Sequence, residues 1–149
     1  MEMNHILIVE DDKDIREAVA IYLKSQGYEV FQAGDGVEGL EMLEREEIHL
    51  AIVDIMMPRM DGITMTMKLR EKHDFPVIML SAKSEEVDKV MGLNIGADDY
   101  VTKPFTPMEL MARVNSQMRR YKRFMEKLQQ KEQENTDTIY TMGGLELNE

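Results

Sequence analysis

The chain has 149 residues and a formal net charge of −11. This length fits one globular domain with a buried core. The content of 43% hydrophobic and 32% charged residues is typical of a folded protein rather than of a disordered chain. Because cysteine is absent, a disulfide framework, a thiolate metal site and a cysteine nucleophile are excluded. No apolar stretch reaches the roughly 18 residues that a membrane span needs, and no signal peptide follows Met1, so we expect a cytoplasmic protein without membrane contact.

Short apolar runs alternate with stretches of helical periodicity from the start of the chain. The first run, His5–Val9, is too short for a buried helix and suits a strand that is covered on both faces. The later strands are predicted at 28–31, 50–53, 76–80 and 100–101. The helices between and after the strands are predicted from apolar residues three or four positions apart, at 15–23, 37–43, 63–73 and 84–94, and from about Pro107 onward.

This alternation predicts an α/β fold. Five strand-then-helix units imply parallel strands joined by right-handed crossovers, with helices on both faces of the sheet. We therefore expect a (βα)5 doubly wound, five-stranded parallel sheet in the order 2-1-3-4-5, the CheY-like or flavodoxin-like arrangement. Ligands of such sheets bind beyond the carboxyl ends of the strands, where the order reverses, which here lies between the first and third strands.

The composition changes toward the C-terminus. Apolar residues that are 4, 3, 4 and 3 positions apart form a heptad pattern; they are Val114, Met118, Tyr121, Met125 and Leu128. Either the fifth helix is long and packs this apolar face on its own domain, or the face pairs with another helix. We assign 1–121 to the first domain and 122–138 to a helical extension and polar linker. Residues 139–147 are expected to form a strand and turn, so 139–149 is expected to begin a truncated second domain.

Three carboxylates follow the two strands at the predicted reversal of strand order. Glu10 and Asp11 end the first strand, and Asp54 ends the third. Their mutual repulsion would raise at least one pKa, and a hard divalent cation with oxygen ligands would relieve it. The trio therefore predicts a Mg²⁺ site. Asp12, in contrast, is predicted to be the N-cap of the first helix.

Asp54 is also the candidate nucleophile, because a carboxylate can accept a phosphoryl group and form an acyl phosphate. That transfer needs its developing charge neutralised. Ser81, at the end of the fourth strand, offers a hydroxyl, and Lys103, after the fifth strand, offers an ammonium at the same edge. Each has an ordinary structural interpretation as well, a helix cap for Ser81 and a solvated charge for Lys103.

These residues stand in motifs that resemble the receiver domain of bacterial two-component response regulators. The resemblance covers Met1 to about Tyr121 and is specific, because five separate pieces match together. The matching pieces are ILIVEDD at 6–12, VDIMMP at 53–58, DG at 61–62, MLSAK at 79–83 and GADDYVTKPF at 96–105.

The resemblance implies that Asp54 is the phospho-acceptor. It also implies that Asp11, Asp54 and the main-chain carbonyl of Met56 bind Mg²⁺ directly, with Glu10 acting through water. A sensor histidine kinase would supply the phosphoryl group. The chain would not be an enzyme in the ordinary sense, because it would catalyse only its own phosphorylation and dephosphorylation.

The resemblance implies further roles around the acceptor. Ser81 and Lys103 are expected to contact the phosphoryl group, and Ser81 and Tyr100 to switch on activation. The residues two positions after Asp54 and after Ser81 flank the approach of hydrolytic water in receivers, and here they are Met56 and Lys83. Neither positions water well, so we expect slow dephosphorylation.

The subfamily indicated is the OmpR/PhoB type. On phosphorylation, these regulators form a dimer whose interface consists of the fourth helix, the fifth strand and the fifth helix. Six charged residues of this chain stand at the positions of the ion pairs in that interface. The implied pairs are Lys89 with Glu109, Asp98 with Arg113, and Asp99 with Arg120. The 140–147 segment is similar to the first strand of the winged-helix domain of this subfamily, and that domain would bind promoter DNA. The 119–123 and 72–79 stretches are similar to VanR-type regulators.

Other classes fit less well. Phosphotransferases of the haloacid-dehalogenase type need a second aspartate two residues after the nucleophile, and that position is Met56. A nucleotide-binding module needs a glycine-rich turn after the first strand, where this chain has acidic residues. The net negative charge disfavours nucleic-acid binding by these residues as a whole. A stand-alone receiver that acts by protein contact without DNA stays open as the alternative.

Overall fold

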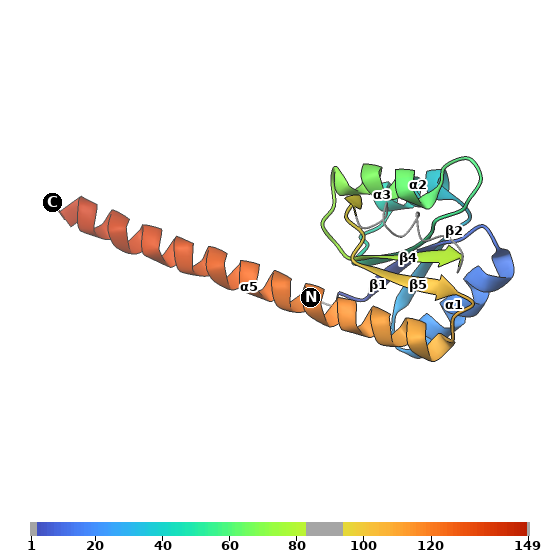
Figure 1. Cartoon of the computed structure of the whole chain (residues 1–149). Coiled ribbons are helices and arrows are strands. Elements are labelled where there is room, and N and C mark those ends of the chain that lie inside the picture. The colour runs from blue at the N-terminus through green and yellow to red at the C-terminus, as the bar shows by residue number, and fades with distance from the viewer. Residues whose placement is uncertain (1–2, 83–93, 149) are drawn as a thin grey trace. The chain divides into compact units, whose positions relative to one another are not determined.

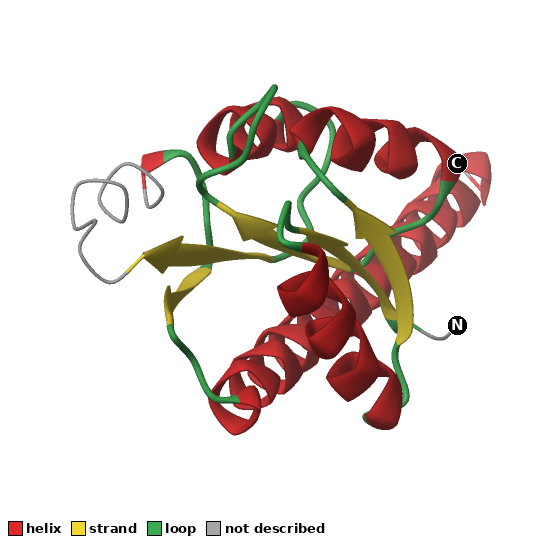
Figure 2. Ribbon diagram, turned by 90° about the vertical axis from the view of Figure 1, so that its right-hand side faces the viewer, coloured by secondary structure: helices red, strands yellow, loops and turns green. Residues whose placement is uncertain are grey.

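The computed structural model describes residues 3–82 and 94–148. Its sheet has five parallel strands in the order β2-β1-β3-β4-β5 (Figures 1 and 2). The strands are β1 (His5–Val9), β2 (Glu29–Ala33), β3 (Leu50–Asp54), β4 (Val77–Ala82) and β5 (Asp99–Lys103). The helices are α1 (Lys13–Ser25), α2 (Gly36–Arg45), α3 (Gly62–Arg70) and α5 (Pro107–Asn148). The predicted fold and strand order are confirmed, whereas nearly all of the helix predicted at 84–94 lies outside the described residues.

Helices cover both faces of the sheet. α2 and α3 lie on one face, and α1 lies with the first turns of α5 on the other (Figure 1). The central strands β1, β3 and β4 are mostly apolar, and all of their residues except His5 and Ala82 are buried, as expected for strands covered on both faces. On the α1 side, Val19 and Leu23 pack in one buried cluster with Leu110 and Val114 of α5 and with residues of β1, β3 and β4.

Aspartates begin three of the helices at the carboxyl edge of the sheet. Asp12, Asp35 and Asp61 are the N-caps of α1, α2 and α3. The predicted cap at Asp12 is confirmed, because its carboxylate accepts hydrogen bonds from the amides of Asp14 and Ile15 at 3.0 and 3.2 Å. Caps of this kind satisfy amides that the helix leaves without partners, and they fix the loops from which the site is built.

The C-terminal part of the chain differs from the prediction. α5 continues to Asn148, so a helix replaces both the polar linker expected within 122–138 and the strand expected within 139–147. A strand needs hydrogen bonds from a neighbouring strand, whereas a helix satisfies its backbone within one segment, which favours a helix here. Contacts group residues 1–118 into one compact unit and 119–149 into a second. The assignment of 139–149 to a second domain stays a prediction.

None of the helices in the described parts of the chain combines the length and the apolar character that crossing a membrane requires.

Candidate functional site

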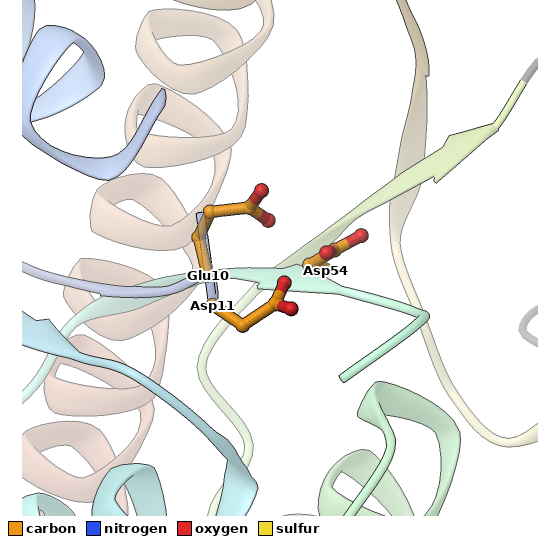
Figure 3. A group of neighbouring side chains, drawn as sticks. All are labelled: Glu10, Asp11 and Asp54. Atoms are coloured by element: carbon orange, nitrogen blue, oxygen red, sulfur yellow. The ribbon is translucent and has the colours of Figure 1, made fainter. Parts of the chain in front are cut away.

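Three carboxylates meet at the carboxyl edge of the sheet. Glu10 and Asp11 directly follow β1, Asp54 is the last residue of β3, and these two strands are parallel neighbours. One carboxylate oxygen from each residue lies within 4.8 Å of those of the other two (Figure 3). Glu10 and Asp54 are buried, with 0% and 5% exposure, whereas Asp11 is exposed. The predicted acidic cluster is therefore present, with one side open to solvent.

Gly62 allows α3 to begin directly against the strand that carries Asp54. A Cβ atom at position 62 would clash with the main-chain oxygen of Asp54, so a side chain does not fit there. The amide of Gly62 donates to the oxygen of Ile55 at 2.9 Å, which closes the loop between β3 and α3 at its base. The Asp61-Gly62 pair of the sequence is thus explained by a helix cap followed by a close backbone approach.

Lys103 reaches the carboxylates from the end of β5. Its Nζ atom lies 2.9 Å from Oε1 of Glu10 and 3.2 Å from Oδ2 of Asp54. A solvated lysine would not contact two buried carboxylates in this way, so the solvated interpretation of Lys103 is wrong.

Burial and charge shift the pKa values of this group. Burial, followed by the neighbouring carboxyl group of Asp54, raises the pKa of Glu10 to about 8. For Lys103, burial lowers the pKa, but its hydrogen bond to Glu10 and the charge of Asp54 outweigh burial and raise it above the ordinary value. Lys103 is therefore charged at neutral pH, and a divalent cation among the carboxylates would favour the ionised form of Glu10.

Two buried oxygen atoms of the site lack a protein partner. Ser81 ends up at the same edge as Asp54, because Leu80 pairs with Asp54 in register and Ser81 follows it in β4. Among the described residues, Oγ of Ser81 and Oε2 of Glu10 are buried side-chain atoms without a hydrogen bond. A buried polar atom without a partner costs about 1–3 kcal/mol. Their position therefore indicates that ligands complete the site, and its oxygen donors fit a hard cation such as Mg²⁺.

The remaining predicted site residues lie around this cluster. Met56 follows Asp54 by two residues in the loop before α3, and its side chain is 60% exposed. Tyr100 lies in β5 and is half-buried. Lys83 and Lys89 lie outside the described residues.

Four of the six charges expected at a dimer interface have partners within the chain. Asp98 accepts hydrogen bonds from Arg70 at 2.7 Å and from the amide of Val77 at 2.8 Å. Asp99 accepts one from Arg113 at 2.6 Å, and the guanidinium of Arg113 also lies 3.8 Å from Glu109. Within one chain, Arg113 thus pairs with Asp99 rather than with Asp98. The pairing between chains stays a prediction, including that of Arg120.

Sequence reasoning did not single out Arg70. This side chain donates to the main-chain oxygens of Gly96, His73 and Phe75 in addition to Asp98. Gly96 and Asp98 are separated from it by 26 and 28 residues, and no sequence pattern connects positions so far apart. The arginine therefore anchors the segment before β5 to the end of α3.

Comparison with known proteins agrees with this geometry. The family model described as "Response regulator receiver domain" matches residues 6–115. The chain is 54% identical over 119 residues to "Regulatory protein VanR" of Enterococcus faecium and 46% identical over 119 residues to "Regulatory protein VanRc" of Enterococcus gallinarum. Each match covers 80% of this chain and 52% of the relative, so the chain spans about half the length of these curated relatives.

Solved structures show the same fold. A Francisella response regulator receiver domain superposes with a TM-score of 0.73 at 36% identity, covering 78% of this chain and 98% of that one. A CheY-like receiver domain protein from Methanospirillum hungatei superposes with a TM-score of 0.77 at 32% identity, covering 82% and 98%. The chain thus belongs to the response regulator receiver domain family of two-component systems.

Proposed function

We propose that Asp54 accepts a phosphoryl group from the phosphohistidine of a sensor kinase in a Mg²⁺-dependent reaction. The observation that carries the proposal is the position of the Asp54 carboxylate. It lies 3.2 Å from the ammonium of Lys103 and within 4.8 Å of the carboxylate oxygens of Glu10 and Asp11. This one side chain therefore faces both a cation donor and a set of cation ligands.

In the proposed transfer, an oxygen of Asp54 attacks the phosphorus. The bond from phosphorus to the imidazole nitrogen of the donor breaks, its electron pair stays on that nitrogen, and the new P–O bond gives an acyl phosphate. Bound Mg²⁺ would supply neutralising charge to the carboxylates and the phosphoryl oxygens. Lys103 contributes its ammonium, and Ser81 contributes a buried hydroxyl that has no partner among the described residues.

Four residues would hold the cation. Asp11, Asp54 and the main-chain carbonyl of Met56 would bind it directly, and Glu10 would bind it through water. The carboxylates of the three acidic residues are close enough to share one ion. The exposure of Asp11 leaves a side from which the cation and the phosphoryl donor reach the site.

The histidines of this chain are not placed to donate the phosphoryl group. All three histidines of the chain lie near the amino ends of strands, at the edge of the sheet opposite the site. His5 begins β1, His49 precedes β3 and His73 precedes β4. None can therefore pass a phosphoryl group to Asp54 within the chain, which supports a separate kinase as the partner.

For the output, we propose a dimer that forms on phosphorylation and regulates transcription through a winged-helix domain beyond this chain, in the cytoplasm. The similarity to proteins described as regulatory, of which the chain spans about half, supports this proposal. A stand-alone receiver that acts by protein contact is the alternative. Promoter-fragment binding by the longer protein, with and without phosphorylation, separates the two.

The phosphorylation site is tested with a small phosphoryl donor. Phosphoramidate with Mg²⁺ should add one phosphoryl group that is stable in acid and labile in base, as measured by intact mass. Asp54→Ala should abolish the addition, whereas Asp74→Ala, which removes an exposed aspartate before β4 at the opposite edge of the sheet, should retain it. Equal incorporation in Asp54→Ala would show that the acceptor lies elsewhere.

A further inference from the structure

The loop between β3 and α3 connects the phospho-acceptor to the rest of the site. It covers residues 55–61, begins next to Asp54 and contains Met56. Two main-chain hydrogen bonds fix its base, from Ile55 to Leu80 at 3.0 Å and from Gly62 to Ile55 at 2.9 Å. Neither bond reaches its outer part, so the conformation there depends on other contacts.

An ion pair holds the outer part of this loop. Arg59 donates from Nε to Oδ2 of Asp35 at 2.7 Å and from Nη2 to Oδ1 at 3.1 Å, a two-point contact that fixes both position and orientation. Asp35 is buried and also caps α2 by accepting from the amide of Glu38 at 2.9 Å. The partner of Arg59 is therefore itself rigidly held.

The backbone at Arg59 is strained. Its φ angle is +65°, and the amide of Met60 donates to the oxygen of Pro58 at 2.7 Å, so Arg59 is the central residue of a tight three-residue turn. A turn of this kind is uncommon, and a residue with positive φ is usually glycine. An arginine in this conformation indicates that its side chain has a role that outweighs the strain.

A second contact supports the same link. Gly36, next to Asp35, packs so closely on Met60 that a Cβ atom there would lie 2.9 Å from the oxygen of Met60. Two consecutive loop residues thus contact two consecutive residues at the start of α2. Ala33, the last residue of β2 and two positions before Asp35, in turn adjoins the acidic cluster, because its oxygen accepts a hydrogen bond from the amide of Glu10 at 3.1 Å.

We propose that Arg59 is a positioning residue of the cation site. By binding Asp35, Arg59 would hold the 55–61 loop in the conformation in which the main-chain carbonyl of Met56 can bind the ion. This inference rests on the proposed Mg²⁺ site. Arg59 does not contact the reacting groups. Its loss should therefore weaken cation binding and leave the chemistry at saturating Mg²⁺ nearly unchanged.

Arg59→Gly is the first test, because glycine adopts the positive φ without strain and lacks the guanidinium that binds Asp35. In calorimetric titration of the 149-residue chain with Mg²⁺ alone, its dissociation constant should rise about tenfold, the usual effect of losing a residue that supports metal ligands. The rate of phosphorylation by phosphoramidate at saturating Mg²⁺ should stay within about twofold of the wild-type rate. Saturating Mg²⁺ fills the site even when its affinity is lower, so a residue that only aids cation binding does not affect this rate. Arg45→Ala, an exposed arginine at the other end of α2, removes the same charge and should leave both values unchanged.

Asp35→Asn provides a second variant, because asparagine retains the helix cap but loses the ion pair. It should raise the dissociation constant as Arg59→Gly does, and the double variant should be no worse than either single one. Unchanged Mg²⁺ affinity in both variants overturns the inference, and so does an equal loss in Arg45→Ala. If the wild-type chain itself does not bind Mg²⁺, the proposed cation site fails, which is a separate result.

Discussion

The ammonium of Lys103 lies 2.9 Å from the carboxylate of Glu10, and this pair links the end of β5 to the end of β1. The same nitrogen lies 3.2 Å from Asp54. One side chain therefore neutralises part of an acidic cluster that a divalent cation is also proposed to occupy. Lys103 and the cation would then compete for Glu10 and Asp54 in binding but act together on a phosphoryl group.

This competition predicts opposite effects of one substitution. Lys103→Ala should bind Mg²⁺ several-fold more tightly, because the carboxylates lose their internal cation. Its phosphorylation by phosphoramidate should nevertheless slow by about 10²-fold or more, the usual cost of removing one group that stabilises developing charge. Calorimetry and intact-mass kinetics measure the two effects. Lys68→Ala, which removes an exposed lysine from α3, is the control and should change neither. Weaker Mg²⁺ binding in Lys103→Ala would contradict the competition.

The pKa of Glu10 predicts how Mg²⁺ binding depends on pH. Burial, followed by the neighbouring carboxyl group of Asp54, raises this pKa to about 8 in the folded chain. A proton then competes with the cation at neutral pH, so Mg²⁺ affinity should rise as the pH increases to about 8 and level off above it. Glu10→Gln should flatten this rise. A dissociation constant that stays constant between pH 6 and 8.5 in the wild type would contradict the assignment.

The same shift has a consequence for stability in the absence of Mg²⁺. Because the folded pKa of Glu10 lies above its ordinary value of 4.5, the folded chain binds more protons than the unfolded chain between that value and about 8. The contribution of Glu10 to the free energy of unfolding should therefore fall as the pH rises through this range. Urea unfolding in EDTA at several pH values measures it, with Glu10→Gln as the reference that lacks the trend.

Charges at the proposed dimer interface already form bonds within one chain. Arg113→Glu should weaken self-association of the phosphorylated chain, and adding Asp98→Arg should restore it only in part, because Asp98 also binds Arg70 and the amide of Val77. Arg45→Glu, an exposed charge reversal on α2, should have no effect. Because these charges are partly exposed, higher salt should also weaken association. Sedimentation that shows the same dimer for wild type and Arg113→Glu would exclude this interface.

The sequence predicted the sheet well because its three central strands, β1, β3 and β4, are short apolar runs that are buried on both faces. The acidic cluster was equally predictable, since Glu10, Asp11 and Asp54 end strands whose neighbourhood follows from the strand order. Contacts between distant side chains were not predictable. Arg59 and Asp35 are 24 residues apart, and neither belongs to a periodic pattern. The end of α5 was also missed, because a polar segment with a few apolar residues is compatible with either a helix or a strand.

Met56 provides the last prediction, on the lifetime of the phosphorylated state. Its side chain is 60% exposed two residues after Asp54, where a polar group would help to align water with the phosphorus. A thioether is only a weak acceptor and positions water poorly.

Met56→Asn should therefore lose the aspartyl phosphate several-fold faster than the wild type. Adding Lys83→Glu should accelerate the loss further, because a carboxylate would replace a cation that can pair with phosphoryl oxygens. Met67→Asn is a matched control, because Met67 is 55% exposed on α3 and removed from the acceptor in sequence. The decay is followed by intact mass after the phosphoryl donor is removed. If the aspartyl phosphate of Met56→Asn decays at the wild-type rate or more slowly, the Met56 side chain does not limit the access of water. If Met67→Asn also accelerates the decay, the loss of any exposed methionine has the same effect.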